Sequence, residues 1–283
     1  PGTVNSIGEN CFLVCINMIR LTFRDGEEVL TLLNTNSMSP SAGSVGYDYF
    51  YDNPIRILYV GRNLDFSVGH TGYEDNYRKS APFYNKKELR KIIFAPSVTI
   101  VPHYMAPECS YLTEVVWGQN ISRIGDYAFF NCRGLTKVDF GRGLETIGNY
   151  SFSNCTSLLY VLFPNMLTTI GESAFEGCVQ LKDVSYQNNY TGQPALSIED
   201  QVFMGCTSIS RMSFPSSLTK IGYQAFDECV NLQQVVFEDS KSEVSVSGKS
   251  SLFKDSHLRS LYIGRNINYS TSPFLNHDSL VDV

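Results

Sequence analysis

The hydrophobic positions of the chain repeat in a fixed phrase through its middle part. The phrase reads I-G-x-x-A-F-x-x-C-x-x-L-x-x-V-x-F, and "IGESAFEGCVQLKDVSY" from Ile170 is a clear copy. Its cysteine recurs at steps of 23, 23, 23, 28 and 23 residues, at Cys109, Cys132, Cys155, Cys178, Cys206 and Cys229. A fixed period in this range is typical of a solenoid, in which each unit stacks on its neighbours to bury its apolar face.

The spacing inside one unit predicts its elements. Val138 and Phe140 alternate with polar residues, which favours a short strand with one buried face. Ala174 and Cys178 lie four residues apart, as on one side of a helical turn. Gly171 follows the isoleucine and fits a tight bend. We therefore predict an α/β solenoid, in which each unit is a strand, a bend and a short helical turn, and equivalent strands pair in a parallel sheet.

Fainter copies extend the pattern toward both ends of the chain. We predict a single array of about eleven rungs over residues 1–283, with regular short repeats at 98–237. Two longer cassettes, near 23–85 and 237–276, share the phrases "LYVGRNLDF" and "LYIGRNINY". Because the chain begins at Pro1 and ends at "SLVDV", both inside a repeat, we expect a fragment or a processed form of a longer protein.

Composition excludes some classes of partner. The net charge is -6 and the pI is about 5.3, whereas nucleic acids and anionic membranes favour a basic surface. No unbroken apolar stretch approaches the length of about 18 residues that a membrane-spanning helix needs. We therefore expect neither nucleic-acid binding nor membrane insertion.

The cysteines are better explained by packing than by chemistry. All of the eight except Cys11 occupy one repeat position, and other rungs place Lys86, Asp255 or His277 there. Such a position need not hold a metal ligand, and free cysteine is among the most buried residue types. We predict buried free thiols and no metal. Zinc at the Cys11 and Cys15 pair is a weak alternative, because no second ligand pair lies nearby in the sequence.

No catalytic motif is complete. The four histidines are scattered, without the H-E-x-x-H spacing of a metalloprotease. The phrase "SGKS" at 247–250 ends like a phosphate-binding loop, but Glu243 stands where that loop needs its first glycine. We therefore expect no catalytic residues, no cofactor and no enzymatic activity.

The outward positions of the predicted sheet supply the candidate binding residues. These positions carry mixed charges, but apolar side chains gather at two places and one aromatic residue stands near the C-terminal end. The candidate residues are Ile57, Tyr59, Ile93, Val116, Tyr160, Leu162 and Tyr262. An apolar patch on a sheet typically marks an interface. Two alternatives stay open: β-propensity alone can select such residues, or the long loop 33–48 can fold over them.

The repeated phrase, together with the proline that follows some copies, resembles the bacterial surface leucine-rich repeat of the BspA-like type. The long cassette with "LYIGRN" is similar to members from gut Bacteroidetes. This resemblance covers nearly the whole chain. It implies a right-handed leucine-rich-repeat superhelix, with the parallel sheet on its concave face and short helical turns on its convex side. It also implies an extracellular or cell-surface location, adhesion to host proteins or cells, and no catalytic residues.

Two functions from different classes follow. The first is a non-catalytic, adhesin-like surface or secreted protein that recognises a host extracellular or cell-surface protein through the concave face or the long loops 33–48 and 67–79. The second is a glycan-binding module of a surface polysaccharide-handling system. Tyr59, Tyr160 and Tyr262 could stack on sugars, but several rungs separate them.

Overall fold

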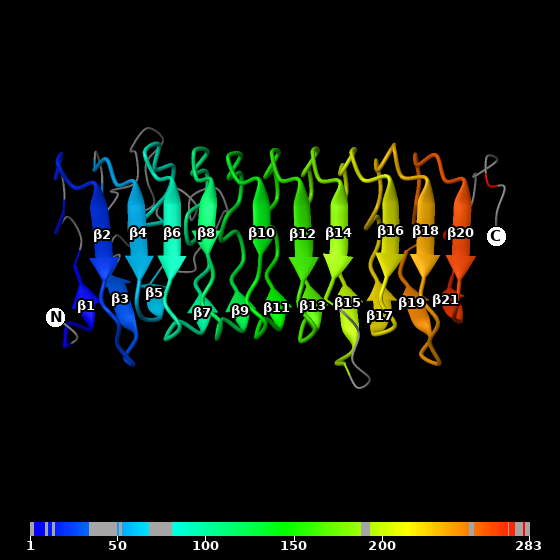
Figure 1. The fold of residues 1–283 in the computed structure, drawn as a ribbon, viewed down its shortest axis with the longest axis horizontal. Helices are drawn as coiled ribbons and strands as arrows, with labels where there is room; N and C mark the ends of the chain where they lie inside the picture. The colour runs from blue at the N-terminus through cyan, green and yellow to red at the C-terminus, as the bar shows by residue number, and fades with distance from the viewer. Residues whose placement is uncertain are drawn as a thin grey trace.

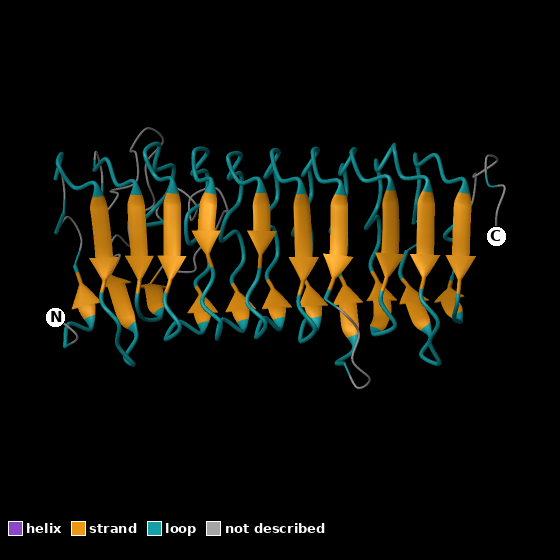
Figure 2. Cartoon of the chain, in the orientation of Figure 1, coloured by secondary structure: helices purple, strands orange, loops and turns teal. Residues whose placement is uncertain are grey.

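The computed structural model describes residues 3–8, 11–12, 15–33, 50, 53–67, 81–187, 193–248, 252–270, 272–274 and 280. Within these residues the chain forms an elongated stack of units (Figure 1). Front strands stand side by side along the whole stack and all point in the same direction (Figure 2). A second row of shorter strands lies at the lower edge of the stack (Figure 2). This is the predicted parallel solenoid, in which each turn of the chain adds one strand to each row.

The front strands pair in register at the repeat spacing. Lys137 lies opposite Tyr160 and Val161 lies opposite Val184, so each partner is the same position of the next unit. The front sheets comprise β2 (Arg20–Phe23), β4 (Ile57–Val60), β6 (Lys91–Phe94) and β8 (Glu114–Val116); then β10 (Lys137–Asp139), β12 (Tyr160–Phe163) and β14 (Asp183–Tyr186); then β16 (Arg211–Phe214), β18 (Gln234–Phe237) and β20 (Ser260–Ile263).

The second row of strands was not predicted. The repeated isoleucine was expected only to precede a bend, whereas Ile147 and Ile170 end short strands that pair with each other. One such sheet comprises β1 (Ser6–Ile7), β3 (Leu30–Leu33) and β5 (Leu64–Ser67). The other comprises β7 (Ile100–Val101), β9 (Arg123–Ile124), β11 (Thr146–Ile147), β13 (Thr169–Ile170), β15 (Leu196–Ile198), β17 (Leu218–Ile221), β19 (Val244–Val246) and β21 (Ile267–Tyr269).

The predicted short helical turns are wrong, since the described residues contain no helix. The A-F-x-x-C segment forms tight turns instead. Tyr127 and Asn131 both have left-handed backbones, with φ of 55° and 58°, and a right-handed helix cannot continue through them. The backbone N–H groups of Phe129 and Asn131 donate to carbonyl oxygens of the next unit, at 2.7 and 2.8 Å. The hydrogen bonds of this segment therefore run along the stack and not within a helix.

Phenylalanine rings form a ladder through the core from Phe129 to Phe274. Phe175 is fully buried, and its ring stacks between Phe152 and Phe203 with centroids 5.3 and 5.7 Å away. Phe163 meets the same ring edge-on at 5.6 Å. The Phe175 ring is thus shared between its own unit and both neighbouring units.

Six of the repeat cysteines are buried between units as free thiols: Cys109, Cys132, Cys155, Cys178, Cys206 and Cys229. The Sγ of Cys155 donates to the carbonyl oxygen of Phe129 in the preceding unit, at 3.3 Å, and Cys178 repeats this contact with Phe152. Cysteine suits the position because it is small and apolar and still offers a weak donor to a buried carbonyl. Burial raises the pKa of Cys155 and of Cys229 to about 12, so these thiols stay protonated at neutral pH.

We expect thiol titration to separate two classes of cysteine. Cys11 is exposed and Cys15 is half-buried, so a thiol reagent at neutral pH should label at most these two quickly. The buried thiols should react only after denaturation, because the thiolate is the reactive form. All eight should then react without any reductant. If the denatured, unreduced protein titrated far fewer thiols, the cysteines would be paired and this description of the core would be wrong.

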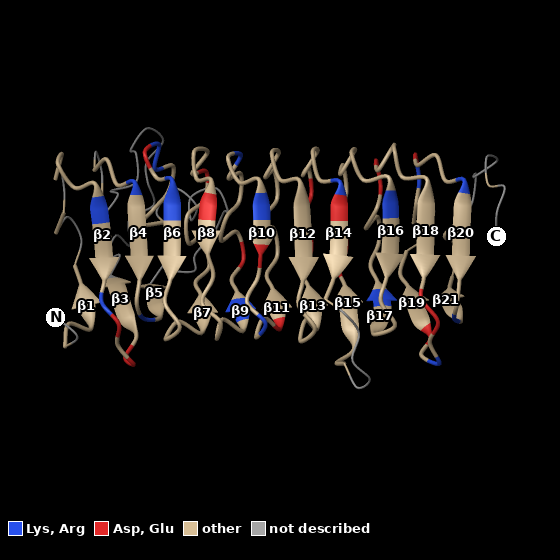
Figure 3. Cartoon of the chain, in the orientation of Figure 1, with Lys and Arg blue, Asp and Glu red and all other residues tan. Residues whose placement is uncertain are grey.

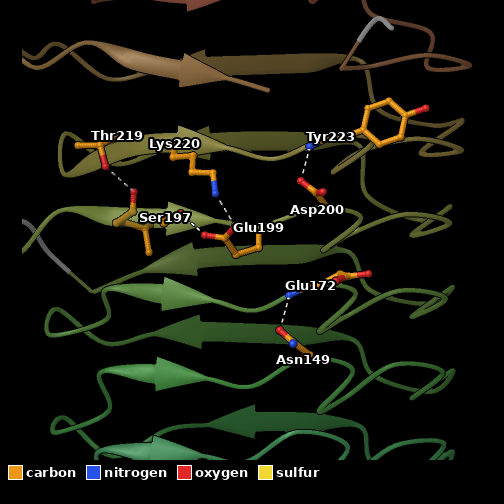
Figure 4. A network of polar contacts seen from close by, with 9 residues as sticks. Asn149, Glu172, Ser197, Glu199, Asp200, Thr219, Lys220 and Tyr223 are labelled. Atoms are coloured by element: carbon orange, nitrogen blue, oxygen red, sulfur yellow. Dashed lines mark hydrogen bonds and ion pairs between the residues drawn. The ribbon is translucent and has the colours of Figure 1, made fainter. Parts of the chain in front are cut away.

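The residue that follows the repeated glycine forms a polar ladder along the stack. The Oδ1 of Asp126 accepts the N–H of Asn149 at 2.8 Å. The Oδ1 of Asn149 in turn accepts the N–H of Glu172 at 2.9 Å (Figure 4). A Cβ on Gly148 would lie 2.6 Å from Asp126 Oδ1, so only glycine fits there. Burial by itself would raise the pKa of Asp126, but hydrogen bonds from His103 and from the Asn149 N–H outweigh it and lower that pKa.

Farther along the stack, side chains of the second row of strands add further ties. Lys220 Nζ and Ser197 Oγ both donate to the carboxylate of Glu199, at 2.5 Å each (Figure 4). The Oδ1 of Asp200 accepts the N–H of Tyr223 at 2.8 Å and so repeats the polar ladder (Figure 4). The units are therefore joined by backbone, side-chain and aromatic contacts on every side, which makes the front sheet a rigid support.

Candidate functional site

The outward side chains of the front strands lie in two rows, which we call the upper row and the lower row of the front face. Strand register places equivalent positions side by side. At the N-terminal end the upper row is Arg20, Ile57, Lys91 and Glu114, and the lower row is Thr22, Tyr59, Ile93 and Val116. Charges of both signs mark the upper row on β2, β6, β8, β10, β14 and β16 (Figure 3).

A shallow, open hollow lies at the N-terminal end of this face, on β2, β4 and β6. Its volume is about 380 Å³. We call it the N-terminal hollow, and it is lined by Arg20, Thr22, Ile57, Tyr59, Lys91 and Ile93. Its surface combines an aromatic ring and two isoleucines with two cationic side chains. The arrangement can therefore offer a ligand both apolar contact and positive charge.

The structure brings four of the predicted binding residues together. Tyr59 lies opposite Ile93, and Ile93 lies opposite Val116 on the next strand. Ile57 and Tyr59 are two residues apart on β4 and point to the same side. Val116 is 38% exposed, and the other three are half-buried by their neighbours in the sheet. These four side chains make one continuous apolar surface that extends from the hollow to β8.

The other predicted residues are separate from this surface. Tyr160 and Leu162 stand on β12, where Lys137 and Asp139 lie opposite them on β10. Tyr262 stands on β20 and is 51% exposed. Its neighbour in the lower row is Val236, on β18. The seven candidates therefore form one cluster and two smaller spots.

Arg20, Thr22 and Lys91 line the hollow beside the predicted residues but were not among the candidates predicted from the sequence. They occupy outward positions of the same strands, so the signal was present in the repeat alignment. It was missed because only apolar outward positions were taken as candidates.

Tyr59 is held by a partner that the sequence reading did not identify. Its hydroxyl donates to Asp25 Oδ1 at 2.8 Å, and this hydrogen bond raises the pKa of Tyr59. The second long cassette repeats the pair, since the Tyr262 hydroxyl donates to Asp239 Oδ1 at the same distance. Each aspartate thereby fixes the direction of an outward-facing aromatic side chain, and Asp25 adds a negative charge below the N-terminal hollow.

An arginine follows each of these tyrosines and is buried. Arg265 donates through Nε to the carbonyl oxygen of Glu238 at 2.8 Å. Its terminal nitrogens reach the carbonyl oxygens of Pro215, Ser216 and Leu218, at 2.9 to 3.2 Å. Arg62 similarly donates to the carbonyl oxygens of Arg24 and Val4. The arginine of the phrase "GRN" in each cassette therefore hydrogen-bonds to backbone carbonyl groups of preceding units. We call this set of hydrogen bonds the arginine clamp.

The repeat that builds this face identifies its family. The profile of the BspA type leucine rich repeat region matches residues 78–194 and 192–283, in six copies. The chain belongs to this family. The resemblance stated from the sequence is thereby confirmed.

Solved structures share the fold of this BspA-type chain. A leucine-rich repeat protein from Bacteroides ovatus is 17% identical over 100% of this chain and 82% of that chain, with a TM-score of 0.54. One from Eubacterium ventriosum is 19% identical over 89% of this chain and 80% of that chain, with a TM-score of 0.51. At these identities the likeness shows the fold alone. No curated protein sequence matches the chain.

Among the described residues of this BspA-type chain, no group of three or more His, Cys, Asp and Glu side chains could hold a metal ion. The part of the chain that the structure describes also contains no helix with the length and apolar character of a membrane span. The predicted loops 33–48 and 67–79 lie outside the described residues, apart from the first residue of each.

Proposed function

We propose that this chain is a non-catalytic, adhesin-like binding protein of the cell surface or the secreted fraction, and that its front face binds a protein partner. The leucine-rich-repeat solenoid is generally a non-catalytic binding scaffold, and BspA-type proteins are typically surface-exposed or secreted. The observation that carries the proposal is the continuous apolar surface of Ile57, Tyr59, Ile93 and Val116 beside the N-terminal hollow.

The physical properties of this surface suit a protein interface. Apolar side chains that adjoin one another on a sheet mark contact sites more reliably than scattered ones. Tyr59 is already oriented by Asp25, and the strands beneath it are fixed by the ladder, so binding would order few groups and lose little entropy. An aromatic anchor of this kind contributes a large share of interface energy, often about 2 kcal/mol or more.

The separation of the exposed tyrosines favours a protein over a glycan. Tyr59, Tyr160 and Tyr262 stand on β4, β12 and β20, so four strand steps separate each from the next. At about 4.8 Å per step, neighbouring tyrosines are at least roughly 19 Å apart, farther than one sugar ring can bridge. A glycan array screened beside a protein pull-down from host extracellular material would distinguish the two. Glycan hits without a captured protein would reverse this preference.

We expect the double substitution Tyr59→Ala with Val116→Ser to weaken partner binding at least tenfold. The change removes the aromatic anchor and one end of the apolar surface, and a tenfold loss corresponds to about 1.4 kcal/mol. Both side chains lie on the outside of the front sheet, so the circular dichroism spectrum should stay unchanged. Affinity is measured with the partner captured in the pull-down, for the wild type and the variant side by side.

The matched control lies on the turn side of the stack. Glu172→Ala with Glu176→Ala alters two side chains in the turn segment of one unit, away from the front strands. This variant should bind the partner with the affinity of the wild type. Equal binding by the wild type and the Tyr59/Val116 variant would remove the N-terminal front face from consideration. The loops 33–48 and 67–79 would then be the leading candidates.

A further inference from the structure

Charge is distributed unevenly around the N-terminal hollow. Arg20 and Lys91 stand on either side of Ile57 in the upper row. Lys91 is neutralised by an ion pair with Glu114, whose Oε1 lies 2.7 Å from Nζ. Arg20 is exposed and forms no ion pair with another described residue. The upper edge of the hollow therefore carries an uncompensated positive charge, on a chain whose net charge is -6.

The lower end of the hollow has the opposite character. Tyr59 and Ile93 offer an apolar surface, and Asp25 accepts the Tyr59 hydroxyl just below them. A ligand carboxylate is attracted at the Arg20 end and repelled at the Asp25 end. An apolar side chain of the ligand gains the most binding free energy over Tyr59 and Ile93, because there it buries apolar surface without desolvating a charged group. This gradient sets the direction in which an acidic, partly apolar ligand would lie.

The distance between the two rows matches an extended peptide. The upper and lower positions of each strand are two residues apart, which is about 6.6 Å. The side chains that an extended peptide presents to one side have the same spacing. A peptide lying over β4 would thus place one side chain over Ile57, beside Arg20 on β2, and the side chain two residues away over Tyr59, beside Ile93 on β6.

We infer that the N-terminal hollow recognises an acidic segment of the partner protein, in which a carboxylate and an apolar side chain are two residues apart, as in Glu-x-Leu. The carboxylate pairs with the Arg20 guanidinium, which can hold both of its oxygens. The apolar side chain lies on Tyr59 and Ile93. This inference rests on the proposed protein-binding function and specifies the chemistry of the partner.

The test is a random peptide library, displayed on phage and selected on the immobilised full chain. The wild type should enrich peptides with an acidic residue two positions from an aliphatic or aromatic one. Synthetic peptides of that sequence should bind Arg20→Glu at least tenfold more weakly than the wild type. A charge-swapped peptide with Lys in place of the acidic residue should instead prefer Arg20→Glu. The affinity of Arg20→Gln for the acidic peptide should lie between those of the wild type and Arg20→Glu.

The matched control is Arg211→Glu. Arg211 is exposed in the upper row of β16 and lies opposite Gln234, where Arg20 lies opposite Ile57, so it carries the same charge outside the N-terminal hollow. It should bind the acidic peptides as the wild type does. A library without an acidic consensus, or equal loss in both variants, would overturn the inference. If the captured partner lost affinity with the Tyr59/Val116 variant but not with Arg20→Glu, the proposed function would stand and the acidic specificity would fall.

Discussion

Phe175→Ala is expected to lower the free energy of unfolding by about 3–5 kcal/mol, the usual cost of removing a fully buried phenylalanine. The ring stacks on Phe152 and Phe203 and meets Phe163 edge-on, so its removal opens a cavity between units. The flat rings on either side cannot close this cavity, because each is held by the next ring of the ladder. Urea unfolding, followed by circular dichroism, measures the loss.

The single tryptophan gives a second probe for this variant. Trp117 contacts the same ladder at Phe129 and Phe152, so its fluorescence should report the unfolding of the units beside Phe175. The control is Asp139→Ala on the front face, which is exposed and should change stability by no more than about 0.5 kcal/mol. If Asp139→Ala proved the more destabilising, the inward and outward positions would be exchanged and the front face wrongly assigned.

Arg265→Met is expected to lower the free energy of unfolding by about 2–4 kcal/mol. The substitution keeps much of the buried volume but removes the donors for four backbone carbonyl oxygens. A buried polar group left without a partner lowers the free energy of unfolding by about 1–3 kcal/mol. The cost is near the upper end of this range when the lost hydrogen bond came from a charged donor. Burial lowers the pKa of Arg265, which agrees with a guanidinium that has exchanged water for these carbonyl groups.

Two comparisons make the Arg265 prediction specific. Arg265→Lys retains the charge but cannot present the planar fork that reaches several carbonyl groups, so its loss should be smaller than that of Arg265→Met but still measurable. Arg259→Met lies on the same unit, where the arginine is exposed, and should be close to neutral. Equal stability of the Arg265 and Arg259 variants would show that the clamp contributes nothing.

The repeat spacing was sufficient to predict the stacking and the front strands. The pairing of Lys137 with Tyr160 and of Val161 with Val184 follows directly from the period. The helical turn was wrong for a reason that the sequence does not reveal. Left-handed backbones normally indicate glycine, whereas here tyrosine, serine, glutamine and glutamate also adopt them. Hydrogen bonds to the next unit stabilise that conformation, and such bonds exist only once the units are stacked.

Part of the site was also predictable from the repeat spacing. Register alone placed Tyr59 beside Ile93 and Ile93 beside Val116. The partner of Tyr59 could not be predicted in the same way, because Asp25 lies beyond the strand, where the repeat alignment is loose. The buried arginines were visible as "GRN" in both cassettes, but an arginine after a strand ordinarily suggests an exposed side chain. The duplicated phrase was therefore the one available sign of their role.

Photo-cross-linking from the front face tests most directly whether its N-terminal end is the binding surface. A benzophenone amino acid replaces Ile93 in one variant and Val236 in another, so that both probes stand in the lower row of the same face. Each variant is irradiated with the captured partner, and the adducts are identified by mass spectrometry. We predict adducts from position 93 and none from position 236. Adducts from position 236 alone, or partner binding without adducts from position 93, would contradict the proposed site.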